Sequence, residues 1–377
     1  MNKSRPGIDW IWLAVIASSC CGLWPLLWPL STLAQLIPDG TLGTTLQTSG
    51  AIDRVNGGFQ AGINLFHSFL ELNGATGRVL SFTDPGVSNI LVRVTGGNPS
   101  TFNGQIAVNG AANLFVLNPN GIVFGPRATL NVRGSFVATT ADAIGFGETG
   151  QFTALPTDLP APLTVQPSAF LFNQLQKGSQ IQSQGNLRLR EGRSLLLIGG
   201  DVSLQGGQVV APRGQIELGG LAQPGAIDLT IADASLSLTY PRDIERGNLR
   251  LSQRALVDTR GSGGGAIQLQ GREIVLQDFS RVLAETTGAA VGKDVFVQAD
   301  QLQLLDGSLI STTTRGPGTG GNLTVNVTGL TQLSGVSPTN AAGGFFSEVT
   351  SGGAGGGLTV NTGQLVVEGG AIVSTAV

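Results

Sequence analysis

Few side chains in this sequence could carry out acid–base chemistry. After residue 34 the chain has one histidine, one tyrosine and no cysteine. Carboxylates that recur beside turns could line up on neighbouring strands and bind Ca²⁺ or cleave a polysaccharide; they are Asp258, Asp278, Asp306 and Glu368. Their offsets within the surrounding repeats differ, so we expect them to support turns and hydration. We predict no catalytic residue, no metal site and no cofactor.

The single histidine, His67, lies between Phe66 and Phe69. No cysteine or carboxylate pair stands beside it to complete a metal site, so we expect a core or rim histidine with a hydrogen-bonded partner. Only 12% of all residues are charged. Few acid–base groups are therefore available to an enzyme. This weighs against one alternative, a secreted β-helix polysaccharide lyase or hydrolase.

The elements around Asn118–Ile122 are the clearest local prediction. Asn118, Pro119, Asn120 and Gly121 have the residue types of a tight turn, with Pro119 presetting φ and Gly121 able to take a positive φ. The flanking runs Leu114–Leu117 and Ile122–Phe124 are continuously apolar, so both are predicted to be strands buried on two faces.

Glycine indicates how the rest of the chain is organised. The sequence contains 57 glycines, and we expect most of them at turns that require a positive φ. Units that open at Gly264, Gly292, Gly320 and Gly355 each hold short alternating strands, at a spacing of about 28 residues that is longer at the last step. A segment at Pro338–Phe346 looks inserted. Three short strands per repeat predict an all-β fold, a right-handed parallel β-helix (solenoid) with an N-terminal cap.

Composition also divides the chain. Residues 1–34 hold both cysteines and all four tryptophans, and a basic start, an apolar stretch and Thr32–Ala34 indicate a signal peptide cleaved near Ala34. An uncleaved anchor and a lipid on Cys20 are the alternatives. We expect a secretion domain at 35–150, further β-helix at 151–245 with a proline-rich excursion at 153–167, and glycine-opened repeats at 246–377 that stop partway through a unit. The net charge of −3 and the lack of a Lys/Arg block argue against a nucleic-acid partner.

Four segments carry a family resemblance: Asn64–Asn73 (NLFHSFLELN), Ser88–Ile106, Ala112–Leu130 (ANLFVLNPNGIVFGPRATL) and Gly134–Ile144. With them, most of residues 37–150 resembles the N-terminal domain of filamentous haemagglutinin-like exoproteins, the secreted partners of two-partner secretion systems. One feature departs from that family: where its members often have a second NPNL-type motif, this chain has Asn98-Pro99-Ser100-Thr101.

The resemblance implies an export route and partners. An outer-membrane β-barrel transporter with periplasmic domains would recognise the N-terminal domain, and the chain would cross unfolded and fold outside. A transporter recognition element, a fold-defining turn, or both at once would be formed by Asn118, Pro119, Asn120, Gly121 and Ile122. The product would be a monomeric adhesin or surface structural protein, secreted or at the cell surface, with a host-cell, surface or polysaccharide ligand. A secretion module whose effector region lies beyond Val377 is the other alternative.

Overall fold

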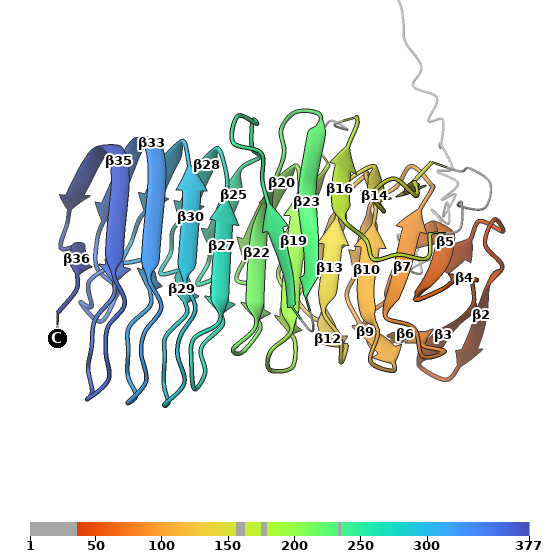
Figure 1. Cartoon of the computed structure of the whole chain (residues 1–377), viewed down its shortest axis with the longest axis horizontal. Coiled ribbons are helices and arrows are strands. Elements are labelled where there is room, and N and C mark those ends of the chain that lie inside the picture. The colour runs from red at the N-terminus through yellow and green to blue at the C-terminus, as the bar shows by residue number, and fades with distance from the viewer. Residues whose placement is uncertain (1–35, 156–162, 175–178, 233–234, 377) are drawn as a thin grey trace, which may run out of the picture. The chain divides into compact units, whose positions relative to one another are not determined.

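The computed structural model describes residues 36–155, 163–174, 179–232 and 235–376. The predicted signal peptide with Cys20 and the centre of the proline-rich excursion lie outside these ranges. Residues 34–377 form one compact unit. Its strands wind into the coils of a parallel β-helix (Figure 1). No helix in the described ranges is long and apolar enough to cross a membrane.

Each coil contributes to three faces, and strands on each face pair in parallel with those of the next coil. The first face holds β5 (Asn64–Leu72), β7 (Asn89–Val94), β10 (Asn113–Leu117), β13 (Phe136–Thr139), β19 (Ser194–Gly199), β22 (Gln215–Gly220), β27 (Ala266–Gln270) and β30 (Val295–Ala299). The second holds β8 (Ser100–Phe102), β11 (Ile122–Phe124), β17 (Gln180–Ser183), β20 (Asp201–Gln205), β25 (Leu249–Ser252), β28 (Glu273–Leu276) and β31 (Gln301–Leu304). In the last two coils the first two faces share the long strands β33 (Leu323–Ser334) and β35 (Leu358–Glu368).

The third face is the longest uninterrupted stack. It holds β3 (Ile52–Gly57), β6 (Val79–Thr83), β9 (Gln105–Asn109), β12 (Thr129–Asn131), β18 (Asn186–Arg188), β21 (Gln208–Val210), β26 (Leu256–Asp258), β29 (Arg281–Leu283), β32 (Leu309–Ser311), β34 (Gly344–Phe346) and β36 (Ile372–Ser374). The predicted three-strand repeat is therefore confirmed. The predicted insertion is partly wrong, because Gly344–Phe346 is the third strand of its coil and Phe345 lies in the core.

An inner core runs through all the coils because the register never slips on the first face. One inward column reads Leu65, Ile90, Leu114, Phe136, Leu195, Ile216, Ile267, Val295 and Leu323, each paired with the next. A one-residue slip would turn this whole set outward, so burial of the column fixes the register.

A second core lies outside the first face. Five antiparallel strands form a covering sheet over it: β14 (Ala143–Gly145), β15 (Gln151–Thr153), β16 (Ala169–Phe172), β23 (Gly225–Ala232) and β24 (Ser235–Thr239). Phe66 and Phe115 belong to this second core, and the ring of Phe66 packs against that of Phe152 in the covering sheet, with the centroids 4.9 Å apart. Leu114–Leu117 is consequently buried on both faces, as predicted, whereas Val123 in β11 is only half-buried, so that part of the prediction is wrong.

The glycines have a different role from the one predicted. Fewer than half of the described glycines have a positive φ. Many instead sit where coil corners touch: a Cβ added at Gly220 would lie 1.2 Å from the backbone oxygen of Gly199, and one at Gly247 would lie 1.4 Å from that of Gly200. Close backbone approach between successive corners thus excludes side chains at these positions.

Polar side chains also stack from coil to coil. Asn361 donates to Asn326 at 2.8 Å, as an amide ladder predicts, but Asn322 pairs with Asp294 instead. Asp278 and Asp306 lie on successive coils, both with φ of 55°, and the Asp278 backbone nitrogen donates to the Asp306 carboxylate at 3.3 Å. These two carboxylates therefore occupy equivalent corner positions on neighbouring coils.

An N-terminal cap closes the first coil. In it β1 (Leu36–Pro38) and β4 (Phe59–Ala61) pair antiparallel with β5, and β2 (Thr44–Ser49) pairs antiparallel with β3. His67 on β5 is fully buried beneath β2, with its ring Nδ1 3.2 Å from the Thr44 hydroxyl and its ring 5.9 Å from that of Phe82. The predicted core histidine with a hydrogen-bonded partner is confirmed. Burial lowers the pKa of His67 to about 4.

We expect the cap to loosen in acid. Between its ordinary pKa of 6.5 and its folded pKa of about 4, His67 binds more protons in the unfolded than in the native state. The free energy of unfolding of the cap should therefore fall by about 3 kcal/mol as the pH drops through this range. Hydrogen exchange of β2 and β5 amides at pH 7 and pH 4.5 would measure it. His67→Gln, which cannot titrate, should remove most of the difference; an undiminished difference would contradict this account.

Candidate functional site

The turn predicted from Asn118–Ile122 connects β10 to β11 at one corner of the coil. The Gly121 backbone nitrogen donates to the Asn118 backbone oxygen at 3.1 Å, and Gly121 has φ of 117°. The turn begins where β10 ends. Side chains of β10 are buried alternately in the inner core and in the second core, and after the turn Ile122 again lies in the inner core. The predicted turn geometry is confirmed.

Asn118 organises the corner and is fully buried. Its side-chain nitrogen donates to the Asn98 backbone oxygen and the Ser100 hydroxyl, each at 3.0 Å. Its side-chain oxygen accepts from the backbone nitrogen of Asn120 at 3.0 Å and from the side-chain nitrogen of Asn120 at 3.1 Å. These bonds tie the turn to the preceding coil, so an apolar side chain here would leave several buried polar groups unpaired.

The segment Asn98–Thr101 lies directly against this turn. Ser100 pairs with Ile122 across β8 and β11, and the Asn120 side-chain nitrogen donates to the Gly96 backbone oxygen at 2.8 Å. Asn98 itself donates to Glu71 at 2.6 Å. The segment Asn98–Thr101 therefore supports the turn at Asn118–Ile122.

A pocket of about 290 Å³ opens beside the turn. Pro119 and Asn120 form part of one wall, and Thr153 to Leu155, at the end of the covering sheet, form part of another. Leu155 is 64% exposed, and Asn120 is the only residue of Asn118–Ile122 that is not buried. Asn120 and the rim of this pocket are therefore what the turn offers to a partner of the folded protein.

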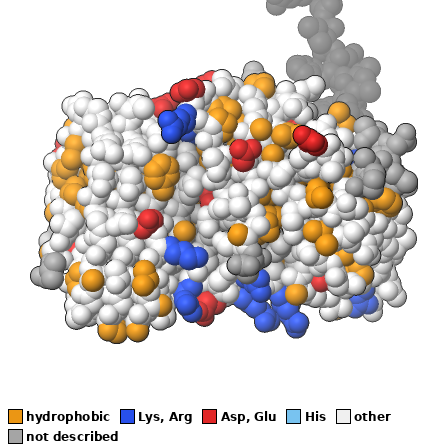
Figure 2. Space-filling model, viewed as in Figure 1, with side chains coloured by type: hydrophobic (Ala, Val, Ile, Leu, Met, Phe, Trp, Pro, Cys, Tyr) orange, Lys and Arg blue, Asp and Glu red, His pale blue; other side chains and the backbone are white. Residues whose placement is uncertain are grey.

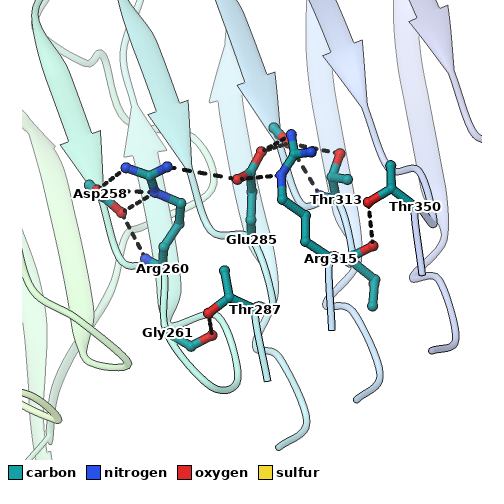
Figure 3. Close-up of polar contacts among 10 residues, drawn as sticks. Asp258, Arg260, Gly261, Glu285, Thr287, Thr313, Arg315 and Thr350 are labelled. Carbon is teal, nitrogen blue, oxygen red and sulfur yellow. Dashed lines mark hydrogen bonds and ion pairs between the residues drawn. The ribbon is translucent and has the colours of Figure 1, made fainter. Parts of the chain in front are cut away.

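Ionisable side chains further along the chain form a ladder across successive coils (Figure 3). Arg260 binds Asp258 at 2.8 Å and approaches Glu285 at 3.9 Å, while Arg315 binds Glu285 through two nitrogens, at 3.0 and 3.1 Å. The hydrogen bond to Glu285 raises the pKa of Arg315, as the bond to Asp258 raises the pKa of Arg260. Each carboxylate has an arginine partner, so the ladder joins coils.

A buried acid that no sequence pattern predicts lies under the covering sheet. Glu217 on β22 is fully buried; one carboxylate oxygen accepts from the Gln215 side chain at 2.5 Å and from the Leu238 backbone nitrogen at 3.3 Å. Among the described residues, its other oxygen and the Tyr240 hydroxyl have no hydrogen-bond partner. Burial raises the pKa of Glu217 to about 8 and raises the pKa of Tyr240 as well.

A buried arginine near the cap is likewise not predicted by any sequence pattern. Arg93 on β7 is 1% exposed; it donates to the Ser68 hydroxyl at 2.7 Å, the Thr41 hydroxyl at 3.1 Å and the Thr153 backbone oxygen at 2.9 Å. Both hydroxyls in turn donate to the Asp39 carboxylate. Burial would raise the pKa of Asp39, but hydrogen bonds from Ser68, Thr41 and Thr95 outweigh it and hold that pKa below its ordinary value.

Within the described ranges, no three His, Cys, Asp or Glu side chains lie close enough together to hold a metal ion. The candidate carboxylates are distributed instead among separate structural roles. Asp258 pairs with Arg260, Asp278 and Asp306 stack at a corner, and Glu368 accepts from Gln332 at 2.9 Å. The candidate site is therefore the turn with its pocket, a surface suited to recognition.

A parallel β-helix with an N-terminal cap, whose second core is closed by an antiparallel sheet, defines the class of capped β-helical domains. The family model described as the TPS secretion domain matches residues 34–269, more than half of the chain, and the chain belongs to this family. It is an exoprotein of a two-partner secretion system, a class that is secreted across the outer membrane by interaction with a dedicated transporter.

The similarity to solved structures concerns the fold. The HMW1 secretion domain from Haemophilus influenzae is 19% identical with a TM-score of 0.55, covering 90% of this chain and 97% of that one. The filamentous hemagglutinin secretion domain is 16% identical with a TM-score of 0.35, covering 91% and 99%. A comparison with curated protein sequences gives no match.

Proposed function

We propose that the exported chain acts as a non-catalytic β-helical adhesin or surface structural protein, and that its transporter recognises the corner formed by Asn118–Ile122. The observation that carries the second part is the contrast between two asparagines of one turn. Asn118 is fully buried and bonded on all sides, whereas Asn120 borders the open pocket. The first side chain suits folding, and the second suits contact with a partner.

The adhesive role rests on how the fold uses its polar groups. The ionisable groups described above join neighbouring coils or lie buried, which suits a stiff shaft better than a catalytic cleft. We further propose cleavage of the signal peptide near Ala34, because β1 begins at Leu36 and pairs at once with β5.

Asn118→Ala and Asn120→Ala should separate recognition from folding. We expect Asn120→Ala to reduce secretion at least about tenfold, while the free energy of unfolding falls by only about 1 kcal/mol, because the half-buried amide of Asn120 donates only to the Gly96 oxygen and to Asn118. Asn118→Ala should lower the free energy of unfolding by about 2–3 kcal/mol, because buried partners lose their bonds. Secreted and cell-retained protein would be quantified with the transporter present, and binding to its periplasmic domains measured directly.

Asn326→Ala is the matched control, since Asn326 also forms one amide hydrogen bond between coils, accepting from Asn361, but lies more than 200 residues further along the chain. It should secrete normally. Normal secretion and normal binding of Asn120→Ala would refute recognition at this corner and leave the turn a purely structural element.

A further inference from the structure

An arginine-lined groove crosses the third face over the first five coils. Its two adjoining hollows, of about 520 and 480 Å³, share Asn131 and Arg190. Arg54 lies at one end, and Arg133, Arg188 and Arg190 lie at the other. We call this surface the arginine groove. Lys and Arg side chains also gather along the lower middle edge of the view in Figure 2, below the end of β12.

The register sets the spacing of these charges. Arg54 pairs with Ser81, Ser81 with Ala107, and Ala107 with Asn131. Thr129 pairs with Asn186, which places Asn131 level with Arg188 on the next coil. Four steps between strands, each of about 4.8 Å, separate Arg54 from Arg188 by about 19 Å. The groove therefore presents positive charge at both ends of an extended trough.

The four guanidinium groups are free to bind a ligand. In the part of the chain that the structure describes, none of them forms an ion pair or a side-chain hydrogen bond. The acids around them are already engaged: Asp53 binds Arg78, Glu191 binds Arg213, and Asp84 accepts from four backbone nitrogens. Local charge in the groove is thus positive although the whole chain carries −3.

The floor indicates the chemistry of the ligand. Between the charged ends it offers the amides of Gln105, Asn109 and Asn131 and the hydroxyl of Ser81, among small apolar side chains. Amides and hydroxyls suit the hydroxyl groups of a sugar. No aromatic residue lines either hollow. A neutral glycan or a nucleic acid would lack its stacking surface, so the affinity must come from anionic groups on the ligand.

From this combination we propose that the arginine groove binds a linear polysaccharide whose repeating units carry carboxylate or sulfate groups. Guanidinium groups bind either oxyanion through paired hydrogen bonds. Residues that are more than 130 positions apart in the sequence build the groove, so it exists only once the coils have stacked. It therefore serves the folded protein outside the cell, and the inference rests on the proposed adhesive function.

The test compares two double variants of the full secreted chain. Arg133→Gln with Arg190→Gln removes two of the four positive charges of the groove, and Arg250→Gln with Arg281→Gln removes the same charge from exposed positions further along the chain. Binding of alginate (carboxylate), dextran sulfate (sulfate) and neutral dextran would be measured by calorimetry at several salt concentrations. Circular dichroism and the thermal midpoint would establish that both variants fold.

We expect the wild type to bind alginate, dextran sulfate or both, with affinity falling as salt rises, and not to bind neutral dextran. The groove variant should bind at least about tenfold more weakly, and the control variant as the wild type does. Absence of binding to both anionic polysaccharides, or an equal loss in the two variants, would overturn the proposal. Poly-glutamate binding as tightly as the polysaccharides would also overturn it, in favour of an acidic protein partner. Secretion assays are independent of these outcomes.

Discussion

Glu217→Gln is expected to stabilise the protein by several kcal/mol at pH 8 and to leave it unchanged at pH 4.5. The pKa of Glu217 rises from an ordinary 4.5 to about 8 because the carboxyl is buried under the covering sheet. Between these values the native state binds more protons than the unfolded state. The free energy of unfolding therefore falls as the pH rises from 4.5 to 8, by about 5 kcal/mol in all.

Urea unfolding of wild type and variant across pH 4.5 to 8.5 would measure this dependence. Glu245→Gln is the control, since Glu245 is an exposed acid in the same region of the chain. The control should follow the wild type, whereas Glu217→Gln should flatten the curve. An identical pH dependence of wild type and Glu217→Gln would show that Glu217 is ionised in the native protein at neutral pH. His67 acts in the opposite sense, so acid loosens the cap while base loosens the covering sheet.

Arg93→Met is expected to release the N-terminal cap. Methionine fills much of the buried volume but cannot donate to Ser68, Thr41 or Thr153. It also leaves the Asp39 carboxylate without its opposite charge. A hydrogen bond to a charged group typically contributes about 1.5–3 kcal/mol, and we expect a loss of at least this size in the free energy of cap opening.

Limited proteolysis and hydrogen exchange of β1 and β2 would measure that opening. Arg127→Met, at an exposed arginine on a neighbouring coil, is the control and should leave protection unchanged. Asp39→Asn should give a smaller loss, because the hydroxyls keep an acceptor. Full protection of β1 in Arg93→Met would mean that apolar packing alone holds the cap.

Sequence patterns predict the features that are local. The turn at Asn118–Gly121 follows from its residue types, and the glycine-opened repeats follow from their spacing. His67 could be placed because its neighbours in sequence are apolar. The double burial of Leu114–Leu117 was predictable for the same reason, since an unbroken apolar run leaves no side for water.

The features that depend on contacts between residues far apart in the sequence could not be predicted from it. Glu217 lies in an alternating strand that reads as half-exposed, and it is buried only because β24 crosses over it. Arg93 has partners more than 50 positions away on either side, at Thr41 and Thr153, so nothing next to it in sequence indicates its burial. The four arginines of the groove are scattered along the chain and become neighbours only through strand register.

The outer aromatic layer has a consequence for any order of folding in which the amino-terminal coils form first. The earliest rungs carry Phe66 and Phe115 on their outside, but the strands that shield these rings end only near residue 239. Until β23 and β24 have folded over the first face, the coils would expose part of this aromatic surface to solvent. In such an order of folding, the amino-terminal coils reach their final stability only after β23 and β24 have added to the covering sheet.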